Sequence, residues 1–256
     1  MLIFSFLSIF EWFLSAIIGI FIGFSKTGIS TIGIFNVSLL VQIFPAKESV
    51  GVMLPMLIIG DIIAVSYYRK AVVWRYLLQL IPWVLIGILA GFVVLWKVPG
   101  DEFQLVLGIL ILCLIVFQFV NDFYKKKELK LFSSKTTKVF GPIMGILAGF
   151  ATMIGNVSGV IMAIYLFSKG LPKKEFIGTG AWFFLAVNLI KIPFYIHIDI
   201  ITVDSLKYNV MMIPFIGLGA FIGIKLIPLI PQKVFQVIVL VLGALGAIAL
   251  ISPKIF

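Results

Sequence analysis

Residues 18–24 read Ile-Gly-Ile-Phe-Ile-Gly-Phe, and residues 144–150 read Met-Gly-Ile-Leu-Ala-Gly-Phe. Both stretches are apolar, and their glycines fall at the same places. Three more pairs of segments match in the same order along the chain: 45–51 with 172–178, 82–91 with 214–223, and 99–104 with 231–236. Several matches in one collinear order predict that the chain consists of two related halves.

The composition of the chain indicates which solvent surrounds it. Of the 256 residues, 62% are hydrophobic and 12% are charged, and the mean hydropathy is +1.23. A soluble protein of this length could not bury so much apolar surface, so lipid must surround much of it. A transmembrane β-barrel would alternate apolar and polar residues, whereas the apolar runs here are continuous. The composition therefore predicts an all-α integral membrane protein.

The continuous apolar runs define five segments in each half: 3–24, 29–44, 49–68, 76–96, 103–121, 137–152, 157–168, 175–196, 206–228 and 234–252. Some of the segments that begin each half are short for a span of about 20 residues, which predicts a short broken helical hairpin there. Their lengths leave open whether these segments cross the membrane fully or re-enter it. The predicted domains are a first repeat (1–122), a basic cytoplasmic linker (123–136) and a second repeat (137–256).

The number of segments predicts how the halves are oriented. Each half has an odd number of segments, so the second half enters the membrane from the opposite side and the repeats are inverted. Fifteen of the 20 lysines and arginines fall at odd-numbered boundaries between segments, with Lys26 in this group and Lys191 in the other. By the positive-inside rule, these boundaries are cytoplasmic and both termini are extracytoplasmic.

The charge and the few metal-ligating residues limit the partners. A net charge of +10 would suggest nucleic acid for a soluble protein. In a membrane protein, excess lysine and arginine belongs in cytoplasmic loops, near membrane lipids, so we expect no nucleic-acid partner. The single cysteine and single histidine, Cys113 and His197, cannot build a Cys/His cluster, so we expect no metal, cofactor or catalytic site.

A polar motif interrupts the first apolar stretch and is a candidate anion site. It contains Ser25, Lys26, Thr27 and Ser30, flanked by glycines that allow the backbone to break. An intramembrane lysine costs about 2.5–3.5 kcal/mol on insertion scales, so it needs a partner or a function. The hydroxyl groups and a nearby helix N-terminus would suit an oxyanion. The alternative is a short loop whose Lys26 extends to the membrane surface.

The matching stretch of the second half has the same plan without a lysine. It offers Thr152, Asn156 and Ser158 as neutral donors. If the two hairpins enter from opposite faces of the membrane, their tips could meet near the midplane. One charged tip and one neutral tip would leave a net positive site for a small anion.

A second matched pair is Asp61 and Asn188, on the third segment of each half. Asp61 lies in an apolar run, so it either pairs with Lys26 or carries a proton, and the sequence favours neither alternative. Trp182 and Lys191 lie near Asn188 on the same predicted helix, and we include Trp182 and Asn188 among the candidate substrate-binding residues. Adjacent aromatic and basic residues at 67–70 are typical of an interfacial anchor.

Several motifs together resemble the sulfite exporter TauE/SafE family of membrane permeases, over nearly the whole chain. The resemblance is carried by residues 23–28, 45–51, 60–61, 67–69, 149–156, 170–176 and 181–184. It implies a carrier in the bacterial inner membrane that moves sulfite, organosulfonates or related anions and is coupled to the proton gradient.

We therefore predict a multi-pass secondary transporter that works by alternating access. Its partners are a small anion, protons and lipids, with Lys26 as the charged ligand and Asp61 as the proton-coupling candidate. An anion channel, or a carrier for a different oxyanion or carboxylate, is the main alternative. An intramembrane enzyme that uses Asp61 or His197 is a weaker alternative, because the sequence has neither paired catalytic carboxylates nor a metal-ligand cluster.

Overall fold

The computed structural model describes residues 7–99, 102–103, 109, 137–231 and 234. The described residues exclude all of the linker 123–136 and nearly all of the predicted segments 103–121, which contains Cys113, and 234–252. The described part is helical, with no strand: α1 (Ile9–Thr27), η2 (Ser30–Ile32), α2 (Gly33–Leu40), α3 (Ala46–Tyr68), α4 (Trp74–Lys97), α6 (Thr137–Gly155), α7 (Gly159–Ser168), α8 (Lys173–His197), α9 (Val203–Leu226) and η3 (Ile227–Leu229).

Five helices are long and apolar enough to cross a membrane: α1, α3, α4, α8 and α9 with η3. Large apolar side chains such as Leu89, Val210 and Phe221 are exposed on the outside of the bundle, where lipid would surround them. The chain is therefore an all-α membrane protein, as its composition predicts.

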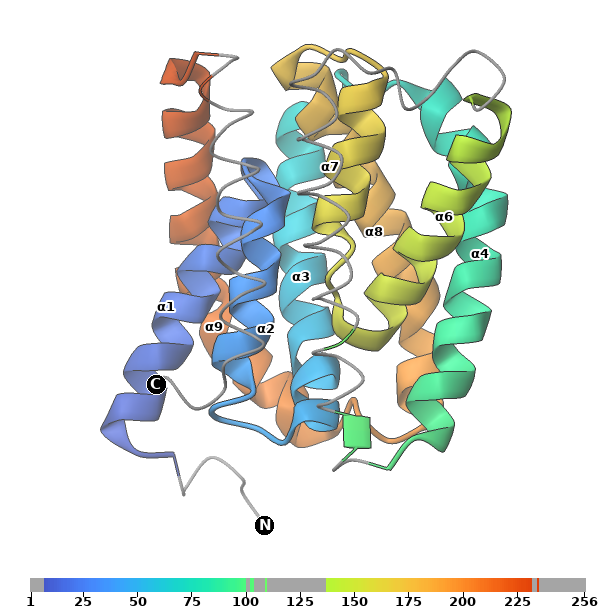
Figure 1. The fold of residues 1–256 in the computed structure, drawn as a ribbon. Coiled ribbons are helices and arrows are strands. Elements are labelled where there is room, and N and C mark those ends of the chain that lie inside the picture. Colours follow the sequence, from blue (N-terminus) through green and yellow to red (C-terminus); the bar gives the residue numbers. More distant parts are fainter. Residues whose placement is uncertain (1–6, 100–101, 104–108, 110–136, 232–233, 235–256) are drawn as a thin grey trace.

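Two antiparallel helical hairpins, α1–α2 and α6–α7, lie in the bundle and open toward opposite ends of it (Figure 1). The returning helices are short, with 8 residues in α2 and 10 in α7. Helix α6 extends to Gly155, three residues beyond the predicted segment 137–152, so Thr152 lies in its last turn. The tips of the hairpins meet, because a methyl group added to Gly159 would lie 2.4 Å from the carbonyl oxygen of Ser30.

The helices pack in pairs, two of which meet through glycine. Helix α3 packs on α8, α1 on α9, and α4 on α6. A methyl group at Gly23 would lie 1.9 Å from the carbonyl oxygen of Ile216, and one at Gly149 would lie 2.1 Å from that of Val84. These distances require glycine, since small residues allow membrane helices to approach closely. Two interfaces on opposite sides of the bundle therefore depend on glycines at matching sequence positions.

A buried tyrosine closes the C-terminal end of the first helix of each hairpin. The Tyr68 hydroxyl donates to the carbonyl of Thr27 (3.1 Å), and the Tyr195 hydroxyl donates to the carbonyl of Met153 (2.7 Å). These bonds satisfy carbonyls that a helix end leaves unpaired. The interpretation of residues 67–70 as an interfacial anchor is therefore wrong for Tyr68, which is buried, although Tyr67 is exposed.

Candidate functional site

The ends of α1 and α6 meet the middle of α3 and α8 around a small central cavity of about 20 Å³. A cavity of this size holds about one water molecule. It is lined by Ser25, Lys26, Ser30, Gly33, Leu57, Thr152, Asn156, Gly159, Phe184 and Asn188. Six of the predicted substrate-binding residues are in this lining: Ser25, Lys26, Ser30, Thr152, Asn156 and Asn188.

Lys26 lies in the last turn of α1 and forms an ion pair with Asp61 of α3. The ammonium nitrogen and Oδ1 are 2.9 Å apart, and the two side chains are 7% and 0% exposed. Gly60 makes room for the lysine stem, because a methyl group there would lie 2.9 Å from Lys26 Cγ. The ammonium group also lies 4.5 Å from the centre of the Phe184 ring. The surface-loop alternative is therefore wrong. Of the two alternatives for Asp61, the structure shows the ion pair with Lys26.

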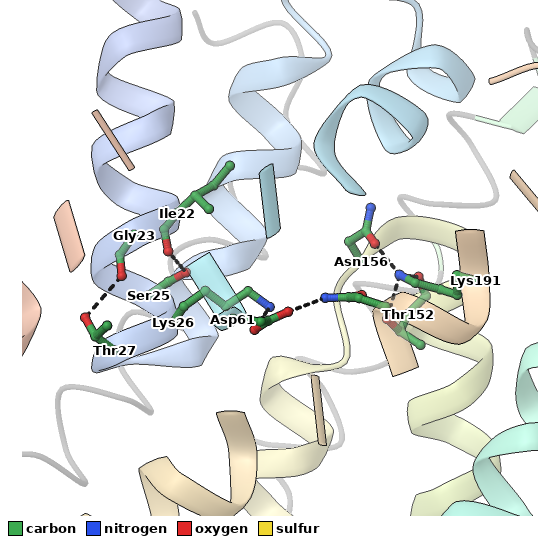
Figure 2. A network of polar contacts seen from close by, with 10 residues as sticks. Ile22, Gly23, Ser25, Lys26, Thr27, Asp61, Thr152, Asn156 and Lys191 are labelled. Carbon is green, nitrogen blue, oxygen red and sulfur yellow. Dashed lines mark hydrogen bonds and ion pairs between the residues drawn. The ribbon is translucent and has the colours of Figure 1, made fainter. Parts of the chain in front are cut away.

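Asp61 also connects α3 to α8. The side-chain amide of Asn188 donates to Oδ2 of Asp61 at 2.6 Å, and both residues are buried. Figure 2 shows the resulting arrangement, with Lys26 and Asp61 on one side and Thr152, Asn156 and Lys191 on the other. The carboxylate of Asp61 thus accepts hydrogen bonds from both halves of the chain.

Lys191 is a second buried lysine, on α8, with no exposed surface. Its ammonium group donates to the carbonyl oxygen of Thr152 (3.0 Å), to the Thr152 hydroxyl (3.1 Å) and to the side-chain oxygen of Asn156. Asn156 follows α6 with φ 56°, a left-handed conformation that asparagine tolerates better than most residues. Its amide nitrogen donates to the carbonyl of Val50 at 3.1 Å. Lys191 therefore fixes the end of α6 to α8.

Lys191 is not among the substrate-binding residues predicted from the sequence. Lys191 and Lys26 were both predicted at boundaries between segments, but protein covers both side chains, so neither is a solvated loop lysine. Without Lys26 and Lys191, 14 of the other 18 basic residues remain at the odd-numbered boundaries, so the bias persists. The signal that could have identified Lys191 was its position three residues after Asn188, on the same face of a helix.

Three predicted site residues do not line the cavity. The Thr27 hydroxyl faces α9 and hydrogen-bonds the carbonyls of Gly23 and Ala220, both at 3.1 Å. Ser158 is buried, and its hydroxyl has no partner among the described residues. Trp182 packs against Trp74, with ring centres 5.1 Å apart. The cavity residues that the sequence analysis missed are Gly33, Leu57, Gly159 and Phe184.

The charges around the cavity do not balance. With both amines protonated and the carboxylate ionised, Lys26 and Lys191 would carry two positive charges against one negative charge on Asp61. Of these three residues, Lys26 lines the cavity, whereas Asp61 contacts Lys26 and Lys191 contacts the lining residues Thr152 and Asn156. The other polar side chains in the lining carry hydroxyls and amides. Because a buried charge is costly unless it is compensated, the surplus positive charge favours a bound anion.

Hydroxyl and amide groups could bind such an anion after small rearrangements. The Ser25 hydroxyl now donates to the carbonyl of Ile22 at 2.8 Å, and a rotation would direct it into the cavity. Ser30, Thr152 and Asn156 come from the two hairpin tips, so an anion between the tips would contact both halves. No group of three His, Cys, Asp or Glu residues that could hold a metal ion occurs in the described part of the chain.

A comparison with protein families identifies the chain. The family model described as sulfite exporter TauE/SafE matches residues 15–250, nearly the whole chain, and so confirms the resemblance seen in the sequence motifs. Comparisons with curated proteins and with solved structures found no match.

Proposed function

Because the chain belongs to the sulfite exporter TauE/SafE family, we propose that it is a secondary transporter for a small sulfur-containing anion, such as sulfite or an organosulfonate. Membership in this family, with five helices able to cross the membrane, makes the chain a multi-pass membrane protein of a transporter family. The family gives no support to an intramembrane enzyme.

The observation that carries this proposal is the surplus positive charge at the central cavity. Two buried lysines lie at the cavity or against its lining, and the one carboxylate beside them, that of Asp61, pairs with Lys26 and not with Lys191. An ionisable group inside a membrane protein is by default a functional one. A singly charged oxyanion would compensate the surplus charge and accept hydrogen bonds from Ser25, Ser30, Thr152, Asn156 and Asn188. Thr27, Ser158 and Trp182 have no part in the proposed site, because they do not line the cavity.

Proton coupling follows from the ion pair. For Lys26 to bind the anion, its ammonium group has to move away from Asp61, now 2.9 Å away. The carboxylate would then be buried without its counter-ion, which favours binding a proton from water. Anion binding to Lys26 and protonation of Asp61 thus occur together, and this coupling links transport to the proton gradient.

Alternating access is the proposed mechanism, with residues 1–122 and 137–256 as inverted repeats. The matching glycines at the α1–α9 and α4–α6 interfaces support the repeat, as do the matching tyrosines Tyr68 and Tyr195. A cavity of about 20 Å³ cannot hold sulfite, so the hairpin tips have to separate for substrate to enter. A cavity smaller than the substrate suits a carrier that changes conformation better than an open channel.

We place the protein in the bacterial inner membrane, with the linker 123–136 in the cytoplasm and both termini outside. The family supports the membrane location. The excess of basic residues at the odd-numbered boundaries, which include the linker, supports the orientation.

The test is sulfite transport into proteoliposomes by Lys26→Ala and Lys26→Arg variants at equal protein content. We expect both to lose most of the transport, because alanine removes the charge and the planar guanidinium of arginine does not replace the compact ammonium group of lysine. Lys207→Ala is the matched control, since Lys207 forms an ion pair of similar length (3.0 Å) with Asp204 but is exposed. Wild-type transport in both Lys26 variants would refute the site assignment.

A counterflow experiment with the wild-type protein separates a carrier from a channel. A carrier preloaded with unlabelled sulfite accumulates labelled sulfite transiently against its gradient, whereas a channel does not. The same assay with organosulfonates, carboxylates and phosphate as competitors identifies the substrate class. Competition by carboxylates or phosphate alone would replace sulfite with one of these anions.

A further inference from the structure

The surroundings of the Lys191 ammonium group have the composition of a cation site. Three oxygen atoms accept its hydrogen bonds: the carbonyl and hydroxyl oxygens of Thr152 and the side-chain oxygen of Asn156. All three oxygens belong to neutral groups, and the lysine is fully buried. Three oxygen atoms around one amine nitrogen match the three hydrogens of an ammonium ion.

This site lies where a broken membrane helix ends. Helix α6 stops at Gly155, and Asn156 turns the chain into the left-handed conformation toward α7. The carbonyl oxygens at the end of a helix carry a partial negative charge, which favours a cation. In transporters with discontinuous helices, such carbonyls are the groups that coordinate Na⁺. The donor set consists of oxygen atoms, the ligands that hard cations prefer.

The first half of the chain does not place a lysine in the same way. At the end of α1, Lys26 belongs to the broken helix itself and forms its ion pair with the carboxylate of Asp61. Lys191 instead comes from the neighbouring helix α8 and extends to the end of α6, without a carboxylate among its partners. Its position is therefore that of an ion bound at a helix end, and not that of half of a salt bridge.

We propose that the end of α6 is a cation site that the ammonium group of Lys191 occupies, in the place of a bound coupling cation. The wild-type protein then needs no Na⁺ for anion transport, because its cation is covalently attached. A variant without the ammonium group binds a free monovalent cation, Na⁺ or an alkylammonium ion, between Thr152 and Asn156. The transport part of this proposal rests on the proposed function, whereas cation binding by the variant does not.

The experiment compares Lys191→Ala with Lys191→Met, each purified in detergent. Alanine removes the side chain beyond Cβ and leaves space beside the three oxygens, whereas methionine fills much of that space with an uncharged chain. The melting temperature is measured in NaCl, KCl, methylammonium chloride and choline chloride at equal ionic strength. Sulfite uptake by the same variants is measured in proteoliposomes in the same four salts.

We expect Lys191→Ala to melt about 2–4 °C higher in NaCl or methylammonium chloride than in choline chloride, because a ligand that binds only the folded state stabilises it. The wild-type protein and Lys191→Met should melt at the same temperature in all four salts. Sulfite uptake by Lys191→Ala should fall about tenfold in choline chloride, the scale of losing charge-assisted hydrogen bonds, and recover in part with the small cation.

Equal melting of Lys191→Ala in all four salts would overturn the proposal. So would failure of this variant to fold in every salt, since Na⁺ or methylammonium should stabilise it. Wild-type uptake by Lys191→Met would also overturn it, because methionine supplies no charge. If the wild-type protein transports no sulfite, the proposed function fails, but the salt dependence of melting still decides whether the end of α6 binds a cation.

Discussion

Both halves of the chain fix the end of a broken helix to their third helix with a lysine, but they do so with different chemistry. In the first half, Lys26 of α1 pairs with the carboxylate of Asp61 on α3. In the second half, Lys191 of α8 donates to neutral oxygens of Thr152 and Asn156 at the end of α6. One attachment is an ion pair, and the other is a charge held by dipoles.

In the proposed function, this difference is the origin of the asymmetry between the halves. A symmetric molecule with two ion pairs would have no surplus charge at its centre, and one with two neutral attachments would have nothing for a proton to neutralise. With one of each, Lys191 supplies a positive charge that no carboxylate balances, and Asp61 supplies a group that can bind a proton. The hydrogen bond from Asn188 to Asp61, at 2.6 Å, connects the two attachments.

The largest expected effect comes from breaking the ion pair on its acidic side. Asp61→Asn leaves Lys26 buried without a counter-ion. Removal of one partner from a buried pair costs about 3–5 kcal/mol. We expect the free energy of unfolding in detergent to fall by about that amount and proton-driven sulfite accumulation to be lost. Chemical denaturation of the purified variant and uptake under a pH gradient measure the two effects.

The double variant Lys26→Met with Asp61→Asn is the control for the charge. It removes both charges, so it should be clearly more stable than Asp61→Asn alone, although it should remain inactive. If the double variant were as unstable as the single one, the loss would come from packing around α3, and the ion pair would not explain it.

The sequence predicted much of the fold, because apolar runs and helix breakers determine where membrane helices begin and end. The predicted segment 76–96 is the helix Trp74–Lys97, and 175–196 is Lys173–His197. The hairpins were predicted from short segments that contain glycine. The orientation of the termini stays a prediction, because the length and composition of the helices do not determine which end faces the cytoplasm.

The site was predicted less completely, because a motif states which groups are present and not which way they face. Thr27 follows Lys26 directly, so it points about 100° around the helix and meets α9 instead of the cavity. Trp182 was chosen for its nearness to Asn188, although a spacing of six residues puts the two on different faces. Phe184 lies four residues before Asn188, on the same face of the helix, so helical spacing could have predicted that it lines the cavity.

An intermediate effect is expected from filling the matched interfaces. Gly23→Ala would place a methyl group 1.9 Å from the carbonyl oxygen of Ile216, and Gly149→Ala would place one 2.1 Å from that of Val84. Overpacking costs about 1–3 kcal/mol. We expect the two variants to lower the free energy of unfolding by similar amounts, since the interfaces have similar geometry. Denaturation in the same detergent measures both.

Gly217→Ala is the control for the glycine variants, because nothing lies within 4 Å of the methyl group that it adds. It should leave stability unchanged or raise it by about 0.5–1 kcal/mol, as alanine does in a helix. A large loss in only one of Gly23→Ala and Gly149→Ala would show that the two interfaces are not equivalent.

The smallest effect is expected from the two tyrosines that close α1 and α6. Tyr68→Phe and Tyr195→Phe each remove one hydrogen bond to a helix-end carbonyl, that of Thr27 or Met153. Each should cost about 1 kcal/mol of unfolding free energy, with Tyr67→Phe, an exposed neighbour, as the neutral control. Hydrogen exchange at the ends of α1 and α6 should rise in the corresponding variant only. Unchanged exchange at both ends would mean that Lys26 and Lys191 alone attach the broken helices to their neighbours. The chemical difference between these two lysines would then be the main difference between the halves.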